Sequence, residues 1–381
     1  MEEWKEYKLG NVLTIKYGKD HKQIADGDIP IYGSGGIMRY GERSLYDGPS
    51  ILIPRKGSLN NIMFANNPFW TVDTMFWTII NEDIANPLFV YYSICKKDFA
   101  SLNVGSAVPS LTVPVIEDID ILLPSKETQN RIVAILKSFD DKIEVNRRIN
   151  DNLEQQAQAL FKSWFVDFEP FKDGEFVESE LGMIPKGWRT LCLRDIVEVS
   201  KKSVNPSKYP DTIFIHYSIP AFDNGMKPEL QLGKDILSNK FTIMNKMTLF
   251  SKLNPRIKRV WYIDEVKDNS ICSTEFVPYR AKDVLFSSYV FSLINSNGFY
   301  DYVMSLVNGA TGSHQRFHLD ETLSYLIPFN NEVVLNYSKI IEPILKTILK
   351  NRVESFRLSS LRDTLLPRLM SGELKINDIS V

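Results

Sequence analysis

The sequence predicts an α+β protein with two β-rich mixed globular blocks and two long helices that pair as an antiparallel coiled coil. Three observations predict this fold. Residues 125–168 contain no Pro or Gly, and their apolar residues are spaced alternately by four and three. The same spacing recurs 205 positions later. Before each helix, short strand-like runs are separated by Gly, Pro and Asn, which is typical of a mixed domain rich in β-structure.

The spacing in both stretches is the a/d register of a coiled coil. The first seam consists of Ile132, Leu136, Phe139, Ile143, Asn146, Asn150, Leu153, Ala157, Leu160 and Trp164. The second consists of Tyr337, Ile341, Ile344, Ile348, Asn351, Ser355, Leu358, Arg362, Leu365 and Leu369. At about 1.5 Å per residue, the first helix would be roughly 60 Å long, too long for one small domain. Polar residues within a seam lower stability but can fix its register.

A duplicated chain folded onto itself forms a pseudo-dimer, which makes the two helices antiparallel and gives the chain a pseudo-two-fold duplication. The alternative is two separate helical hairpins, each packed on its own domain. Pro343 lies inside the second helix and should mark a start or a kink in its first turns.

The predicted boundaries follow the duplication. They are 1–124 for the first block, 125–168 for the first helix, 169–187 for a linker that reverses the chain, 188–329 for the second block, 330–372 for the second helix and 373–381 for a tail. In the first block we predict strands at 29–32, 50–54, 62–65 and 70–80, and a helix at 87–99. The middles of the two blocks differ in sequence, although the segments leading into the helices are similar.

Composition restricts the class of protein. A chain of 381 residues with 44% hydrophobic residues suggests about two globular domains. No run of eighteen apolar residues occurs and the N-terminus lacks a signal pattern, so we expect a cytoplasmic protein without a membrane segment. The three cysteines form no C-x-x-C pair, and His314 and His318 lack a third ligand, so no metal site is predicted.

The motifs of catalysis are missing. The sequence has no P-loop, and Asn67-Pro68-Phe69-Trp70 lacks the second Pro of an amino-methyltransferase motif. Glu265-Val266-Lys267 is an isolated triplet of a kind that occurs by chance. We therefore predict neither a catalytic site nor a bound cofactor for this chain.

Two basic stretches stand out in a chain whose net charge is −2. Residues 240–263 carry six cations, no acid and four aromatic residues, and residues 48–72 also lack acids. Such stretches suit phosphate contact and recognition of base edges from loops. The candidate DNA contacts are Lys19, His21, Lys22, Arg55, Lys56, Ser58, Asn60, Asn61, Lys240, Lys246, Lys252, Arg256, Lys258 and Arg259. The alternative is that they are solvated strand edges with cations that prevent aggregation.

Several segments resemble a known family. Residues 179–188 (SELGMIPKGW) look like its domain-start signature, and 361–374 (LRDTLLPRLMSGEL) like its C-terminal signature. Residues 29–33 (IPIYG) and 53–58 (IPRKGS) are similar to the first recognition domain of one subgroup. The family is the specificity (S) subunit of type I restriction–modification systems, and the resemblance spans the whole chain.

The resemblance implies a non-catalytic role. Two target recognition domains would each recognise half of a split site in double-stranded DNA. The two helices would separate these domains and dock two modification (methyltransferase) subunits. S-adenosylmethionine would belong to those subunits, and ATP and Mg to the restriction (translocase and endonuclease) subunits. Unlike block middles imply an asymmetric site. The competing hypothesis is a protein-binding structural adaptor whose helices act as a ruler.

Overall fold

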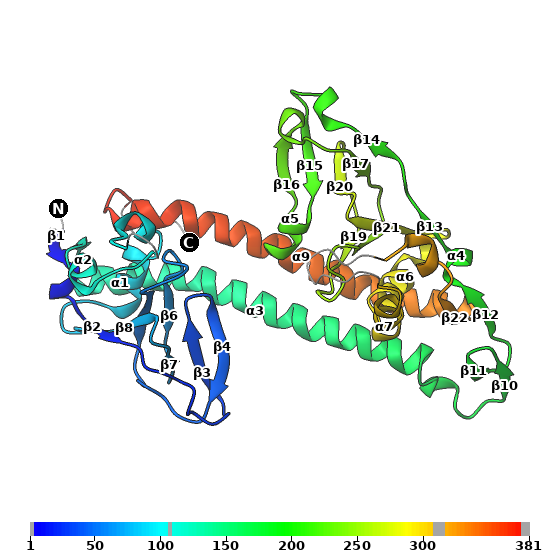
Figure 1. Cartoon of the computed structure of the whole chain (residues 1–381), viewed down its shortest axis with the longest axis horizontal. Coiled ribbons are helices and arrows are strands. Elements are labelled where there is room, and N and C mark those ends of the chain that lie inside the picture. The colour runs from blue at the N-terminus through cyan, green and yellow to red at the C-terminus, as the bar shows by residue number, and fades with distance from the viewer. Residues whose placement is uncertain (1–3, 106–108, 308–316, 375–381) are drawn as a thin grey trace. The chain divides into compact units, whose positions relative to one another are not determined.

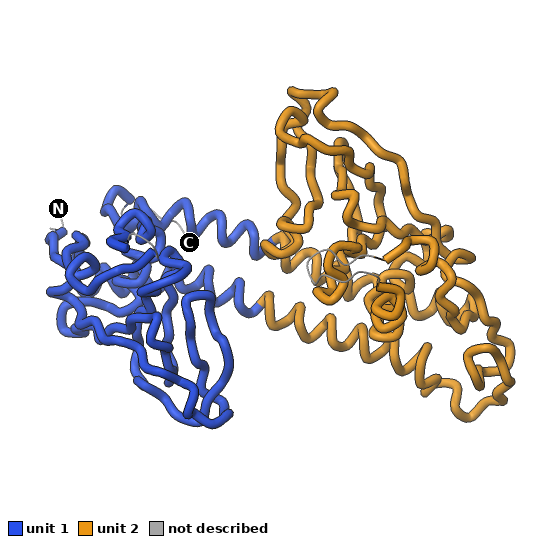
Figure 2. The backbone as a smooth tube through the Cα atoms, viewed as in Figure 1, with its two compact units in different colours: residues 1–145, 354–381 blue, residues 146–353 orange. Residues whose placement is uncertain are grey.

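The computed structural model describes residues 4–105, 109–307 and 317–374. The chain forms two compact units, 1–145 with 354–381 and 146–353 (Figure 2). Two helices of 40 residues each, α3 (Lys126–Phe165) and α9 (Asn331–Met370), contribute to both units (Figure 1). The α+β class and the two long helices predicted from the sequence are confirmed.

The first unit holds a β-rich block with three small sheets. A two-stranded sheet pairs β1 (Lys5–Lys8) with β9 (Asp120–Leu123). The four-stranded sheet has the order β2-β8-β5-β6, with bounds Leu13–Tyr17, Met75–Ile80, Ser50–Pro54 and Met63–Ala65. The three-stranded sheet has the order β4-β3-β7, with bounds Gly36–Gly41, Ile29–Gly33 and Trp70–Thr71. Two helices, α1 (Pro87–Ile94) and α2 (Val113–Glu117), complete the block.

The second unit contains a larger block. Its two-stranded sheet pairs β12 (Arg189–Cys192) with β22 (Leu326–Phe329). A four-stranded sheet has the order β13-β21-β18-β19, with bounds Val197–Val199, Phe276–Ala281, Met247–Ser251 and Val260–Ile263. A five-stranded sheet has the order β14-β17-β20-β15-β16, with bounds Ser203–Val204, Lys240–Thr242, Ser270–Ser273, Ile213–Tyr217 and Glu229–Leu232. The helices are α4 (Leu193–Ile196), α5 (Ile219–Asp223), α6 (Ser287–Ile294), α7 (Asn297–Ser305) and α8 (Leu319–Thr322).

The two blocks repeat one strand topology. The order β2-β8-β5-β6 in the first corresponds to β13-β21-β18-β19 in the second, and the parallel pair β3–β7 corresponds to β15–β20. The pairs β1–β9 and β12–β22 also correspond, while β14 and β17 extend the second block. Cores tolerate extensive hydrophobic substitution when the pattern of buried positions is kept, so a shared topology survives divergent sequence.

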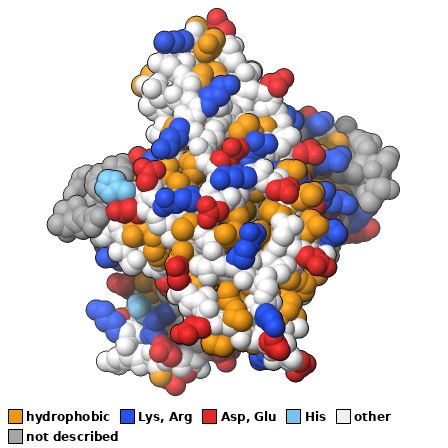
Figure 3. All heavy atoms as spheres, turned by 90° about the vertical axis from the view of Figure 1, so that its right-hand side faces the viewer, with side chains coloured by type: hydrophobic (Ala, Val, Ile, Leu, Met, Phe, Trp, Pro, Cys, Tyr) orange, Lys and Arg blue, Asp and Glu red, His pale blue; other side chains and the backbone are white. Residues whose placement is uncertain are grey.

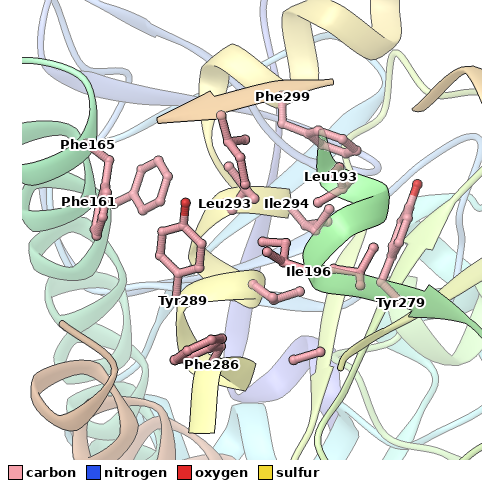
Figure 4. Packing of buried hydrophobic residues seen from close by; sticks show 14 of the residues in the cluster. Phe161, Phe165, Leu193, Ile196, Tyr279, Phe286, Tyr289, Leu293, Ile294 and Phe299 are labelled. Carbon is pink, nitrogen blue, oxygen red and sulfur yellow. The ribbon is translucent and has the colours of Figure 1, made fainter. Parts of the chain in front are cut away.

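Each block is joined to the long helices by a common hydrophobic core. In the first unit, Leu136 of α3 and Leu369 of α9 are fully buried in the cluster that contains Phe89 of α1. In the second, Phe161 and Phe165 of α3 pack with Tyr289 of α6, as Figure 4 shows. Burying these large side chains contributes about 1.5–3 kcal/mol each, so the helices are structural parts of both blocks.

The helices run antiparallel to each other within each unit. In the first unit, Arg362 pairs with Asp140 and Glu354 with Lys142. In the second, Asn351 Nδ2 donates to Asn150 Oδ1 at 2.9 Å. Every position of both predicted seams is buried or half-buried. The helices therefore contact each other, unlike the alternative of two independent hairpins.

Some sequence-based boundaries need correction. The helix predicted over 87–99 ends at Ile94, and a separate 3₁₀ turn follows at Phe99–Leu102, where Asp98 accepts a hydrogen bond from the Ser101 N–H. The strand predicted over 70–80 is two strands, β7 and β8.

Residues 169–187 contain regular secondary structure, and Pro343 lies inside a helix. Residues 169–187 contain a hairpin of β10 (Phe176–Ser179) and β11 (Gly182–Pro185), with Gly182 at a φ of +86°. Pro343 does not mark the start of a helix, since α9 begins at Asn331 and continues through it. None of the described helices combines the length and apolarity needed to cross a membrane.

Candidate nucleic-acid interface

The two basic stretches found in the sequence each contain one loop, and these loops are equivalent in the repeated fold. The first basic loop, residues 55–62, joins β5 to β6. The second basic loop, residues 252–259, joins β18 to β19. These strands correspond in the two four-stranded sheets. Because loops tolerate variation on a fixed scaffold, this position suits side chains that differ between the blocks.

The first basic loop presents polar and cationic side chains to solvent. Lys56, Ser58 and Asn60 are exposed, and Arg55 is half-buried with its guanidinium 5.8 Å from the centroid of the Tyr17 ring. Tyr17 itself is 56% exposed. An amine, a hydroxyl, an amide and an exposed aromatic ring are the groups that contact phosphates and base edges.

Two residues of this loop bind the rest of the block. Asn61 Nδ2 donates to the Ser34 carbonyl at 2.8 Å, in the turn between β3 and β4. Asn60 Nδ2 donates to the Asp98 carboxylate at 3.1 Å, and its Oδ1 accepts from the Ala100 N–H at 2.8 Å. The loop is therefore held at two places.

Gly57 gives the first basic loop its shape. Its φ is +87°, which disfavours side-chain-bearing residues, and a Cβ there would lie 2.6 Å from Ser34 Oγ. Both constraints favour glycine at this position.

The second basic loop is arranged differently. Arg256 is exposed and Lys252 half-exposed. Lys258 Nζ donates to the Asn295 carbonyl at 2.5 Å, and burial lowers the pKa of its ammonium group. Arg259 is 8% exposed and makes two hydrogen bonds to the Asp223 carboxylate, at 2.7 and 2.9 Å. Of these four cations, Arg256 and Lys252 are the better placed for an external ligand.

Three aromatic residues of the 240–263 stretch are buried inside the second block. Phe250, Trp261 and Tyr262 are no more than 4% exposed and belong to the hydrophobic core. The interpretation of this stretch as loops with aromatic probes is therefore wrong for these three, whose spacing reflects the core faces of β18 and β19.

Two cations of that stretch are also engaged by the protein. Lys240 is buried in β17, where its Nζ donates to the hydroxyl of Ser238 at 2.6 Å. Lys246 Nζ lies 2.7 Å from the carboxylates of both Asp264 and Glu342. Lys246 thereby connects the second block to α9.

The third candidate group lies on the segment after β2. Lys19 and Lys22 are exposed, whereas His21 is half-buried and accepts a hydrogen bond from Arg39 Nε at its Nδ1 at 3.3 Å. The equivalent segment after β13 carries exposed Lys201 and Lys202, which our sequence analysis did not select. Their signal was available in the sequence, since Lys201 and Lys202 are adjacent and closely follow a strand, as Lys19 and Lys22 do in the first block.

One face of the molecule carries charges of both signs (Figure 3). On the face shown in Figure 3, cationic and acidic side chains alternate and form no single continuous basic area.

No metal-binding arrangement was found within residues 4–105, 109–307 and 317–374, where no three or more His, Cys, Asp or Glu side chains gather suitably. His318 is among these residues, and His314 lies outside them.

Comparison with known proteins gives a consistent result. Residues 1–155 match the family model described as the type I restriction modification DNA specificity domain. The type I restriction enzyme MjaIX specificity subunit of Methanocaldococcus jannaschii is 27% identical, covering 94% of this chain and 89% of that protein. The HindI specificity subunit of Haemophilus influenzae is 22% identical, covering 98% of this chain and 100% of that protein.

The fold has a solved counterpart as well. The crystal structure of a type I restriction–modification S subunit from M. genitalium has a TM-score of 0.60 at 14% identity, covering 97% of this chain and 96% of that one. This likeness establishes the fold. With a family model that matches residues 1–155 and relatives that align along nearly the whole sequence, the chain is similar to type I restriction–modification specificity subunits.

Proposed function

We propose that this chain recognises an asymmetric bipartite site in double-stranded DNA, with each β-rich block contacting one half. The long helices set the spacer between the halves and dock two modification subunits. DNA methylation is carried out by those subunits with S-adenosylmethionine. Translocation and cleavage belong to restriction subunits with ATP and Mg.

One observation carries the proposal. A single strand topology occurs twice, and each copy presents a basic loop at the same position with different residues. The exposed polar side chains are Lys56, Ser58 and Asn60 in the first loop, and Arg256 in the second. Equivalent placement supports a shared role, while unlike side chains favour unlike half-sites, because base choice depends on the groups presented to the groove.

The outer faces of the helices support subunit docking. On α3, Val145 and Ile149 are 46% and 41% exposed and lie one helical turn apart. Exposed aliphatic groups beside charged neighbours such as Arg148 resemble the mixture found at protein–protein interfaces.

Methylation mapping tests the proposal. The chain would be expressed with its modification subunits in a host that otherwise lacks them, and adenine methylation would be mapped across the host DNA. We expect one motif with two unlike halves around a fixed spacer, absent from a host without this chain. A structural adaptor would give no motif that depends on the chain. Phosphate contacts make DNA affinity fall steeply as the salt concentration rises. A complex built on a structural adaptor would not show this fall.

A further inference from the structure

Arg259 of the second basic loop is bound by another side chain of the same block. Arg259 is the last residue before β19, and two of its nitrogens bind the Asp223 carboxylate at 2.7 and 2.9 Å. Asp223 ends α5 in the connection between β15 and β16. With 8% of its side chain exposed, Arg259 cannot also reach a DNA groove without breaking this pair.

The first block has the same connection made from different groups. Asn61 lies at the corresponding end of the first basic loop and donates to the Ser34 carbonyl at 2.8 Å. Ser34 lies between β3 and β4, the strands that correspond to β15 and β16. In both blocks, the end of the basic loop is thus fixed to the neighbouring strand connection.

A second attachment also recurs. Asn60 binds Asp98 and the Ala100 N–H, in the segment after α1. Lys258 Nζ donates to the Asn295 carbonyl, and the Tyr300 hydroxyl donates to the Arg256 carbonyl at 3.0 Å, both after α6. Helices α1 and α6 each follow the corresponding strand, β8 or β21. Unrelated residues thus hold both loops at the same two places.

We infer that Arg259 with Asp223, and Asn61 with Ser34, are positioning pairs that fix the two basic loops for half-site recognition. Arg256 and Lys56 are then the residues that reach DNA. This inference rests on the proposed function. It separates the candidate residues into those that hold the loops and those that contact the ligand.

The two possible roles of Arg259 predict opposite effects for Asp223→Asn. If Arg259 contacted DNA directly, removing a nearby carboxylate would leave binding unchanged or strengthen it, because carboxylates repel phosphates. If Arg259 positions the loop, the same variant weakens recognition of the second half-site although it removes negative charge. The expected loss is about 5- to 150-fold, the discrimination carried by one good base contact.

The experiment uses the full chain assembled with its modification subunits and duplexes carrying the mapped site. Affinity is measured for the intact site and for duplexes altered in either half, at several salt concentrations. The variants are D223N and R259K, with D173N as the matched control that removes an exposed acid elsewhere in the same unit. R259K keeps the cation but cannot form the two-point contact. N61A is the corresponding change in the first block.

We expect D223N and R259K to reduce discrimination at one half-site and N61A at the other, with D173N unchanged. Tighter or unaltered binding by D223N, or full discrimination by R259K, would overturn the positioning role. A failure of the proposed function would look different, because the unaltered complex would then discriminate neither half-site. Should D223N fail to fold, full discrimination by R259K or by N61A would still overturn the positioning role.

Discussion

The two asparagines that meet in the seam of α3 and α9 allow the energetics of helix pairing to be tested. Asn351 Nδ2 donates to Asn150 Oδ1 at 2.9 Å, and Asn150 Nδ2 donates to the Ile348 carbonyl at 3.2 Å. Asn150 is 8% exposed, so water cannot readily replace a lost partner. Replacing Asn351 by Leu removes the donor to Asn150 and should lower the free energy of unfolding by about 1–3 kcal/mol.

Replacing both asparagines by Leu should cost much less than the sum of the two single changes. Apolar groups then face each other, and no side-chain polar group of this pair remains buried without its partner. The interaction energy of the double-mutant cycle should therefore be about 1–3 kcal/mol in size, well above the roughly 0.5 kcal/mol scatter of independent sites.

Urea denaturation of the full-length chain and its three variants measures the cycle, with Val353→Ala as a control on the same helix, since Val353 is 68% exposed. The reasoning is refuted if Asn351→Leu alone stabilises the protein, or if the two single effects add in the double variant.

Three further predictions address function and pH. Arg256→Ala should weaken binding to one half-site and Lys56→Ala binding to the other, by about 1–3 kcal/mol for a bidentate base contact. Equal loss of affinity for both half-sites in a duplex-binding assay would contradict this. Removing one heptad from α3 and one from α9 at facing positions shortens each helix by about 10 Å and should shorten the spacer between the half-sites by about three base pairs. The spacer is read from the methylated motif. An unchanged spacer would show that the helices do not set it. Hydrogen bonds from Lys246 and Lys346 lower the pKa of Glu342 below its ordinary value of 4.5, so its contribution to stability is present above that pH and lost below it. Urea midpoints measured from pH 6 to 3 should fall less for Glu342→Gln than for the unaltered chain, and parallel curves would exclude the effect.

The long helices could be predicted because one local rule governs forty residues. Alternate spacing by four and three forces a continuous apolar seam, and each seam position is buried or half-buried in the structure. Pro343 does not start the second helix, because a proline disturbs only the turn before it. Ile341 before the proline and Leu345 after it are both buried in one hydrophobic cluster, which holds the helix on both sides.

The candidate site was predicted less completely. Composition located both basic loops, but it could not separate cations that contact a ligand from those bound by the protein. That distinction depends on contacts distant in sequence, such as Arg259 with Asp223, 36 positions apart, and Lys246 with Glu342, 96 positions apart. The duplication was predicted, but the strand order within each block was not, since strand order is set by pairing between distant segments.

The central claim is that two β-rich blocks with one duplicated topology and different loop residues together specify a bipartite DNA site. The most direct measurement is the adenine-methylation map of a host carrying this chain with its modification subunits, compared with the same host carrying the Arg256→Ala chain. We predict a motif with two unlike halves and a fixed spacer, which becomes degenerate in only one half in the variant. A continuous motif, or a change in both halves at once, would contradict the account.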